Sequence, residues 1–300
     1  MPVRVCRTVV VVLAALVLSA GTATLQSQPQ SPDPSTSTAD VVEAAAAYVA
    51  KYEQQLTSVV AMEVSTQRLL RTPSTDPGAP RTRALKSEMF FMFSPAEHEW
   101  MAVRDVNEVD GKRVENPPDL KKAIETVPLV QIARTLKSYS SRYNIGTIVR
   151  NFGEPTLSLL VLDANHRANF GFASKGVERR SGAVLVTLYF REHGSETLLR
   201  DVSGASVQSE GELVVEAMTG RIRRAVLKAR LGAVQAELTT TYQPDAGLDL
   251  WVPSVFSEQY DENSSSSSVG TAYRGTLESI LCEAKYSNFR RFQAFGQIKK

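Results

Sequence analysis

The sequence has few of the residues on which metal and nucleophilic chemistry depend. Its 300 residues include two cysteines and three histidines, and His98, His166 and His193 lie far apart. Structural zinc sites need closely spaced cysteine and histidine ligands, and the sequence has no such spacing. Glycine-rich phosphate loops and the Gly-x-Ser-x-Gly pattern of serine hydrolases are also absent. We therefore expect no metal site, no cofactor, no catalytic residues and no enzyme activity.

An excess of charge of either sign is also missing. The chain has 34 Lys and Arg residues against 32 Asp and Glu residues. Two of the basic residues, Arg4 and Arg7, lie in the predicted leader described below, so the remaining chain has no net charge. Proteins that bind DNA or RNA through phosphates carry a clear basic surplus. We expect no nucleic-acid partner.

The N-terminus has the pattern of a secretory signal peptide. Arg4 and Arg7 precede an unbroken apolar run, residues 9–20, and small residues follow it up to Ala23. The run is shorter than the roughly 20 residues that a membrane-spanning helix needs. The pattern predicts cleavage after Ala23, export to the periplasm or the extracellular space, and no integral membrane segment thereafter. Thr24 stands where a lipid anchor would require cysteine, and Cys282 remains as a single cysteine without a disulfide partner.

A linker and then one domain follow the predicted signal peptide. Residues 24–39 are rich in Ser, Thr, Pro and Gln, a composition typical of a disordered tether. Asp40 and Glu43 fit a capping box, which predicts that an amphipathic helix begins at Asp40. The domain is expected to span residues 40–297.

Most of the domain alternates apolar and polar residues with the period of strands. Asp110-Gly111 predicts a two-residue hairpin that sets Glu108 opposite Arg113. Short helices are expected over residues 118–140 and 155–164, and Pro253 suggests an edge strand or a bend. The order predicts an α+β fold: one large curved antiparallel sheet, with the N-terminal helix and the mid-chain helices covering its concave face.

The last predicted strand contains Cys282 and a run of rings and arginines, "KYSNFRRFQAF", residues 285–295. A reactive cysteine needs a histidine or a cation beside it. No histidine is near in the sequence, and Arg290 and Arg291 lie too far along the same strand. We expect Cys282 to pack as a small buried residue beside Ile280 and Ala284. Because neither face of this strand is purely apolar, we expect it near the margin of the sheet.

Two segments carry a resemblance to a known group of proteins. "AAAAYVAKYEQQLTSVVAMEV" leading into a strand, and "EAMTGRIRRAVLKARL" followed by "TTTYQPDAGLDLWVPSVF", resemble the LolA/LolB-like superfamily of periplasmic lipoprotein carriers. "VRDVNEVDGKRV", "SRYNIG" and "AKYSNFRRF" also look like a group of uncharacterised secreted bacterial proteins. The resemblance implies a half-barrel that binds acyl chains in an apolar concavity. It also implies an arginine on the sheet that tethers the lid helices.

Apolar rows on successive predicted strands suggest a ligand site of this kind. The residues that we expect to line it are Phe91, Val184, Val186, Leu188, Phe190, Leu227 and Leu238. The hypothesis is an exported, non-enzymatic protein that binds a lipid, an acyl chain or a lipidated or apolar protein partner of the envelope. The alternative is a structural or interaction protein in which the same rows form a close-packed core.

Overall fold

The structure is a computed structural model. It describes residues 37–71, 81–94, 99–117, 135, 138–150, 152–201, 203–263 and 276–291. These residues belong to one compact unit, Pro34–Lys300. The predicted signal peptide and most of the predicted linker lie outside the described residues, as do residues 118–134 of the expected mid-chain helices.

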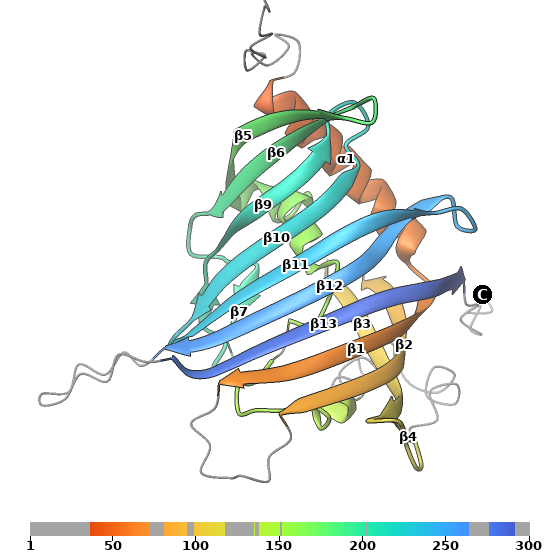
Figure 1. Cartoon of the computed structure of the whole chain (residues 1–300). Coiled ribbons are helices and arrows are strands. Elements are labelled where there is room, and N and C mark those ends of the chain that lie inside the picture. The colour runs from red at the N-terminus through yellow and green to blue at the C-terminus, as the bar shows by residue number, and fades with distance from the viewer. Residues whose placement is uncertain are drawn as a thin grey trace, which may run out of the picture. The chain divides into compact units, whose positions relative to one another are not determined.

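One helix precedes a long series of strands (Figure 1). The helical elements are α1 (Thr38–Leu56) and the 3-10 helices η1 (Leu157–Leu162) and η2 (Arg167–Asn169). The strands are β1 (Val59–Arg71), β2 (Thr82–Ser94), β3 (Glu99–Val109), β4 (Lys112–Arg113), β5 (Phe170–Arg180), β6 (Ala183–Glu192), β7 (Leu199–Arg200), β8 (Ser206–Val207), β9 (Ser209–Glu216), β10 (Ile222–Leu231), β11 (Val234–Asp245), β12 (Leu250–Asn263) and β13 (Thr276–Arg291).

Eleven strands form one sheet in the order β4-β3-β2-β1-β13-β12-β11-β10-β9-β6-β5, and β7 and β8 form a separate pair. Every pairing in the large sheet is antiparallel. The two outermost strands, β4 and β5, do not pair with each other, so the sheet is curved but not closed. Helix α1 crosses behind the sheet in Figure 1 and covers its concave face. The predicted α+β half-barrel is confirmed.

The first helix begins two residues before the predicted start. Ser37 is the N-cap and Asp40 is the third helical residue: the Asp40 amide donates to the Ser37 hydroxyl, and the Ser37 amide donates to the Asp40 carboxylate. The prediction that Asp40 caps the helix is therefore wrong, because Ser37 completes the same type of capping box one turn earlier. The apolar stripe from Val41 to Leu56 is buried as predicted, except that Tyr48 is half-buried.

Two other local predictions are confirmed. Asp110 and Gly111 both have positive φ, and Glu108 pairs with Arg113 across the two-residue hairpin. The apolar segment after Pro155 is helical, as a 3-10 helix whose six residues are all buried. Of the expected helix over residues 118–140, the structure describes helical backbone at 135 and 138–140.

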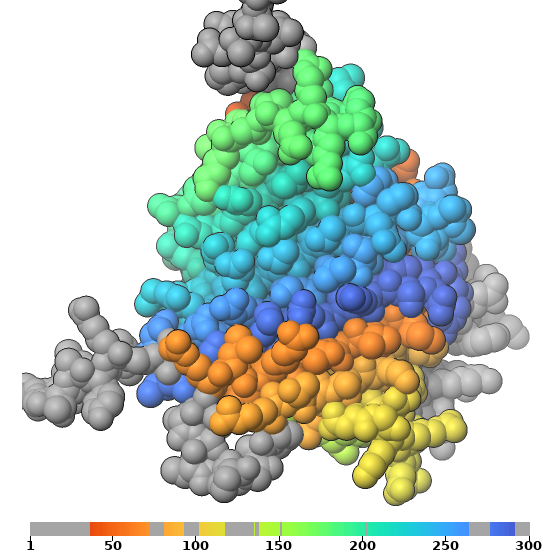
Figure 2. All heavy atoms as spheres, in the orientation of Figure 1, coloured from red at the N-terminus to blue at the C-terminus, as the bar shows by residue number. Residues whose placement is uncertain are grey.

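Two strands lie further inside the sheet than the sequence suggested. Strand β12 is interior, so the suggestion that Pro253 marks an edge strand is wrong. Pro253 lies at an irregularity in the pairing of β12 with β11, which agrees with the suggested bend. Strand β13 lies between β1 and β12, as Figure 2 shows for the dark blue strand, so its predicted marginal position is also wrong. Asn288 has a φ of 53° at a shift in register, and Phe289 stacks on Phe91 beyond it. This bulge explains why neither face of the segment looked apolar.

Gly220 provides a test of the close packing between α1 and the β9–β10 turn. This residue has a φ of 68°, and a Cβ on it would lie 2.0 Å from the carbonyl oxygen of Ala44 in α1. Gly232 also has positive φ but has open space where its Cβ would be. We expect Gly232→Ala to lower the free energy of unfolding by about 1–2 kcal/mol through backbone strain alone. Gly220→Ala should cost a further ~1–3 kcal/mol because the helix must shift. Urea denaturation of both variants checks this, and equal losses would contradict the close contact.

Candidate functional site

The apolar part of the concave face contains the residues predicted to line a ligand site. Phe190, Leu227 and Leu238 lie in one row that crosses β6, β9, β10 and β11, with Gly211 between the first two. Leu188 and Val186 occupy the next rows along β6, and Val184 is half-buried at its start. Phe91 lies on β2, across β1, β13 and β12 from this group, and joins the same core. The structure therefore places six predicted residues together and the seventh apart.

Two elements cover these rows. The buried face of α1, including Val49 and Tyr52, packs in the same cluster as the strands. The segment η1 inserts four leucines and Val161 beneath the helix, against α1 and β10. Within the described residues the side chains of α1 and η1 thus occupy the space over the predicted lining residues.

Few polar contacts hold η1 to the sheet. The Thr240 hydroxyl and the Tyr242 hydroxyl both donate to the carbonyl oxygen of Pro155, at 2.6 and 3.0 Å. The helix itself uses 3-10 hydrogen bonds, whose geometry is poorer than that of an α-helix. Its position depends mainly on apolar packing, which is non-directional and tolerates replacement by another apolar group.

A carboxyl group is buried where α1 meets η1. Glu53 on α1 is 7% exposed, and its Oε1 has no hydrogen-bond partner among the described residues. Burial raises the pKa of Glu53 to about 7, and the nearby Asp163 carboxylate at the end of η1 adds to the increase. A protonated Glu53 is compatible with the packing of α1 on η1. An ionised Glu53 would place its negative charge near that of Asp163 across the contact between the two helices.

The other part of the concave face, over β1, β3, β12 and β13, is polar. Glu63, Ser65 and Gln67 on β1 point inward and are buried, while Met62 and Val64 are 42% and 45% exposed. Arg104 on β3 donates to both carboxylate oxygens of Glu63, at 2.6 and 2.9 Å. Burial disfavours charge on Arg104, but the Glu63 carboxylate outweighs this and holds the pKa of Arg104 above its ordinary value.

The mid-chain segment 143–150 lies across this polar region. Glu278 on β13 accepts hydrogen bonds from the amides of Thr147 and Ile148, and Gln67 accepts one from the amide of Ile145. Arg104 also donates to the carbonyl oxygen of Gly153, just beyond the segment, at 3.4 Å. Side chains of three strands therefore fix the backbone of this segment.

Arg150 anchors the same segment from its own side. It donates to Gln67 Oε1 and to the Ile145 carbonyl oxygen, both at 3.0 Å, and to Cys282 Sγ at 2.7 Å. Beneath it lies a cavity of about 60 Å³ that Arg104 and Glu258 also line. Such a volume accommodates a few water molecules at most, whereas ligand pockets are several times larger.

Cys282 is half-buried and not fully buried as expected, and its surroundings differ from the prediction in one further respect. A cation does lie beside it, because the fold brings Arg150 from far along the sequence. Burial nevertheless raises the pKa of the thiol to about 12, and the Glu258 carboxylate adds to the increase while Arg150 opposes it. The thiol is therefore protonated at neutral pH, which does not suit a nucleophile.

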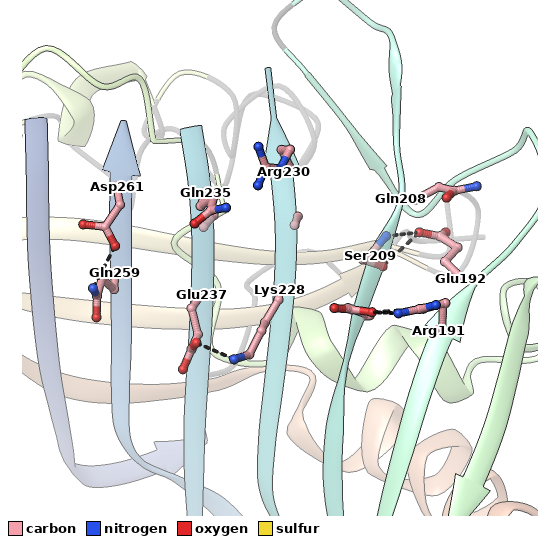
Figure 3. Close-up of a pocket in the computed structure, with 13 residues that line it drawn as sticks. Arg191, Glu192, Gln208, Ser209, Lys228, Arg230, Gln235, Glu237, Gln259 and Asp261 are labelled. Carbon is pink, nitrogen blue, oxygen red and sulfur yellow. Dashed lines mark hydrogen bonds and ion pairs between the residues drawn. The ribbon is translucent and has the colours of Figure 1, made fainter. Parts of the chain in front are cut away.

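A second hollow, of about 560 Å³, opens on the sheet near the ends of β6, β9, β10 and β11 (Figure 3). Its side chains are mostly charged or amide groups, and several satisfy each other. Lys228 pairs with Glu237 at 2.8 Å, and Arg191 pairs with Glu210 at 2.7 Å. This lining does not suit an acyl chain, and exposed ion pairs of this kind contribute little to stability.

Sequence reasoning missed the polar cluster of Glu63, Gln67, Arg104, Arg150 and Glu258. The alternation of Glu63, Ser65 and Gln67 shows that these residues share one face of β1. Nothing in the sequence shows that this face is the buried, concave face of the sheet. The arginines that meet them come from other parts of the chain. Glu258 also belongs to the cluster, and burial is the main cause that raises the pKa of its carboxyl group.

Comparisons with known proteins give similar structures but no sequence family. No family model and no curated protein matches the chain. A putative outer membrane lipoprotein-sorting protein domain from Vibrio parahaemolyticus is 8% identical, with a TM-score of 0.38 over 85% of this chain and 93% of that one. A DUF1329 family protein from Desulfovibrio piger is 13% identical, with a TM-score of 0.36 over 84% and 93%. A LolA superfamily protein from Nitrosomonas europaea is 10% identical, with a TM-score of 0.34 over 85% and 94%. The names of the first and third of these proteins refer to lipoprotein sorting and to the LolA superfamily.

Replacement of Arg104 tests the polar cluster. Arg104→Met leaves Glu63 buried without its partner, and we expect the free energy of unfolding to fall by about 3–5 kcal/mol. Lys86→Met removes a cation from the exposed pair with Glu108 and should cost about 1 kcal/mol or less. Adding Glu63→Leu to Arg104→Met should recover much of the loss, because no charge is then stranded. Chemical denaturation measures all three, and a similar cost for Arg104→Met and Lys86→Met would contradict the prediction.

Glu53 predicts a pH dependence of stability. The folded chain keeps the Glu53 proton up to about pH 7, whereas the unfolded chain loses it near the ordinary value of 4.5. The folded state therefore binds more protons in this window, and the free energy of unfolding falls as the pH rises from about 4.5 to about 7. Glu53→Gln should remove this decrease and be more stable than the parent chain above pH 7. The control is Glu43→Gln, on the exposed face of the same helix, and thermal denaturation at several pH values compares them.

Proposed function

We propose that the chain is an exported, non-enzymatic protein that binds a hydrophobic ligand, a lipid or acyl chain, against the concave face of its sheet. In this proposal a lipidated partner protein can supply the acyl chain. One observation carries it: the apolar rows of β6, β9, β10 and β11 are covered by α1 and by η1, a six-residue 3-10 helix. The leader pattern of residues 1–23 supports export.

The proposed site is closed in this conformation, and η1 acts as an internal plug. Its four leucines and Val161 fill the place that an acyl chain would take, so ligand and plug compete for the same apolar surface. Exchange of one apolar group for another changes the free energy little, which is what reversible loading requires. The lining residues remain those predicted: Phe91, Val184, Val186, Leu188, Phe190, Leu227 and Leu238.

In this proposal the polar cluster stays in place when η1 moves. Arg104 and Arg150 bind the segment that leads into η1, through Gly153 and Ile145. The superfamily that the sequence resembles uses an arginine of the sheet to tether lid helices, and Arg104 is the residue of this chain best placed for that part. No helix in the described residues has the length and hydrophobicity to cross a membrane.

The second candidate is a structural or interaction protein of the envelope with a permanently packed core. Six of the seven predicted lining residues, all except Val184, are buried, which favours this candidate because close packing is the default for apolar strand faces. The two candidates differ in whether α1 and η1 move when an acyl chain is offered.

Thiol labelling separates the two candidates. In a chain whose own cysteines are replaced, Leu159→Cys places a buried thiol in η1 and Ile280→Cys places one in β13, in a separate cluster with Leu69 and Ile145. If an acyl chain displaces the plug, we expect a fatty acid to accelerate labelling at position 159 several-fold and saturably. Labelling at position 280 should not change, because the sheet and the segment that covers its polar part stay in place.

The control variant distinguishes displacement from unfolding. Acceleration at both positions would mean that the fatty acid unfolds the chain, and the site would be rejected. No acceleration at either position, together with no saturable binding of a fluorescent fatty acid, would leave the packed interaction protein. Differential scanning calorimetry of each variant before labelling shows that both are folded.

A further inference from the structure

Five arginines gather on two neighbouring turns at one rim of the sheet. Arg179 and Arg180 end β5 just before the β5–β6 turn, and Arg221, Arg223 and Arg224 follow the β9–β10 turn. We call residues 178–184 and 216–224 the basic rim; they contain five arginines and two acidic residues, Glu178 and Glu216. This excess of positive charge contrasts with the chain as a whole, whose formal net charge is +2.

The sheet brings the two turns together. Leu185 pairs with Glu216, and the amide of Ala217 donates to the carbonyl oxygen of Val184 at 2.9 Å. Gly220, in the second turn, lies against the backbone of Ala44 in α1. The basic rim is therefore one continuous surface, and it adjoins the helix that covers the apolar rows. In Figure 1 the tip of the β5–β6 hairpin lies beside α1.

The positive charge of the rim is only partly compensated. Glu216 pairs with Arg223 at 3.2 Å and with Arg221 at 3.6 Å, so one carboxylate serves two guanidinium groups. No ion pair is found for Arg180 or Arg224 within the part of the chain that the structure describes, and both are exposed. The next turn carries Asp245 and Asp249, which bound the basic rim on that side.

Apolar and aromatic groups lie among these arginines. Met218, at the tip of the β9–β10 turn, is 84% exposed. The guanidinium carbon of Arg223 lies 3.9 Å from the ring centroid of Trp251, which is half-buried. An exposed methionine beside arginines and a tryptophan is the combination that suits the boundary between lipid headgroups and acyl chains.

We propose that the basic rim docks on a lipid bilayer that carries anionic headgroups. Arg180 and Arg224 would contact phosphate groups, and the Met218 side chain would enter the boundary with the acyl chains. The inference rests on the proposed function, since a protein that takes up acyl chains has to meet the membrane that holds them. Docking at this rim places α1, and the apolar rows beneath it, next to the bilayer.

Vesicle sedimentation of the purified chain tests the proposal. The probes are vesicles of phosphatidylcholine alone and vesicles of equal parts phosphatidylcholine and phosphatidylglycerol. We expect binding to the anionic vesicles at low salt, a decrease as salt screens the charges, and little binding to phosphatidylcholine alone. Arg180→Gln with Arg224→Gln should weaken partition by about 30-fold, since each arginine near an anionic surface contributes about fivefold.

Two matched controls make the test specific. Arg113→Gln with Arg230→Gln removes the same charge from exposed sites on β4 and β10 outside the rim, and should leave partition nearly unchanged. Met218→Ser should weaken binding, whereas Leu70→Ser, at an exposed leucine of β1, should not. Equal loss in both arginine pairs, equal binding to both kinds of vesicle, or binding to acidic proteins without vesicle binding would overturn the proposal.

Failure here is distinct from failure of the proposed function. The labelling experiment at positions 159 and 280 uses a fatty acid in solution and no membrane. A chain that passes that test but does not bind anionic vesicles takes up acyl chains without docking at the basic rim.

Discussion

An open antiparallel sheet of eleven strands has to cover its concave face, and this constraint organises the whole molecule. The sheet has two kinds of surface to cover. Over β6 and β9–β11 the rows are apolar, and α1 and η1 cover them with apolar side chains. Over β1, β3, β12 and β13 buried carboxylates and amides require partners, and two arginines with the backbone of residues 143–150 supply them. The apolar region is thus covered by apolar helices, and the polar region by a segment with hydrogen-bonding groups.

The two regions differ in how easily their covers can leave. Removal of an arginine from the polar region strands a buried carboxylate, a cost that no small apolar ligand can offset. Removal of η1 from the apolar region exposes hydrocarbon, which an acyl chain can cover again. The proposed function uses this difference: one cover is held by directional bonds, and the other by contacts that a ligand can reproduce.

The fold could be predicted from the sequence because its main signals are local. Helical spacing from Val41 to Leu56, the Asp110-Gly111 turn and the alternation along β10 and β11 each depend on a few neighbouring residues. The position of β13 could not be predicted, since the bulge at Asn288 exchanges its two faces midway. The polar cluster could not be predicted either. Glu63 and Arg104 meet only because β1 and β3 curve toward each other across β2, and neither residue has a sequence signal that points inward.

The place of β13 in the sheet also determines when the chain can fold. Strand β1 pairs with β2 on one side and with β13 on the other, so Val59 near the start of the domain meets Arg291 near the end of the chain. The interior of the sheet therefore stays incomplete until the last strand has emerged from the ribosome. Sheets that join distant parts of a chain form slowly, because the chain loses the entropy of loop closure before the stabilising strand contacts form. A chain that cannot complete its central strands early remains unfolded for longer while it is being made.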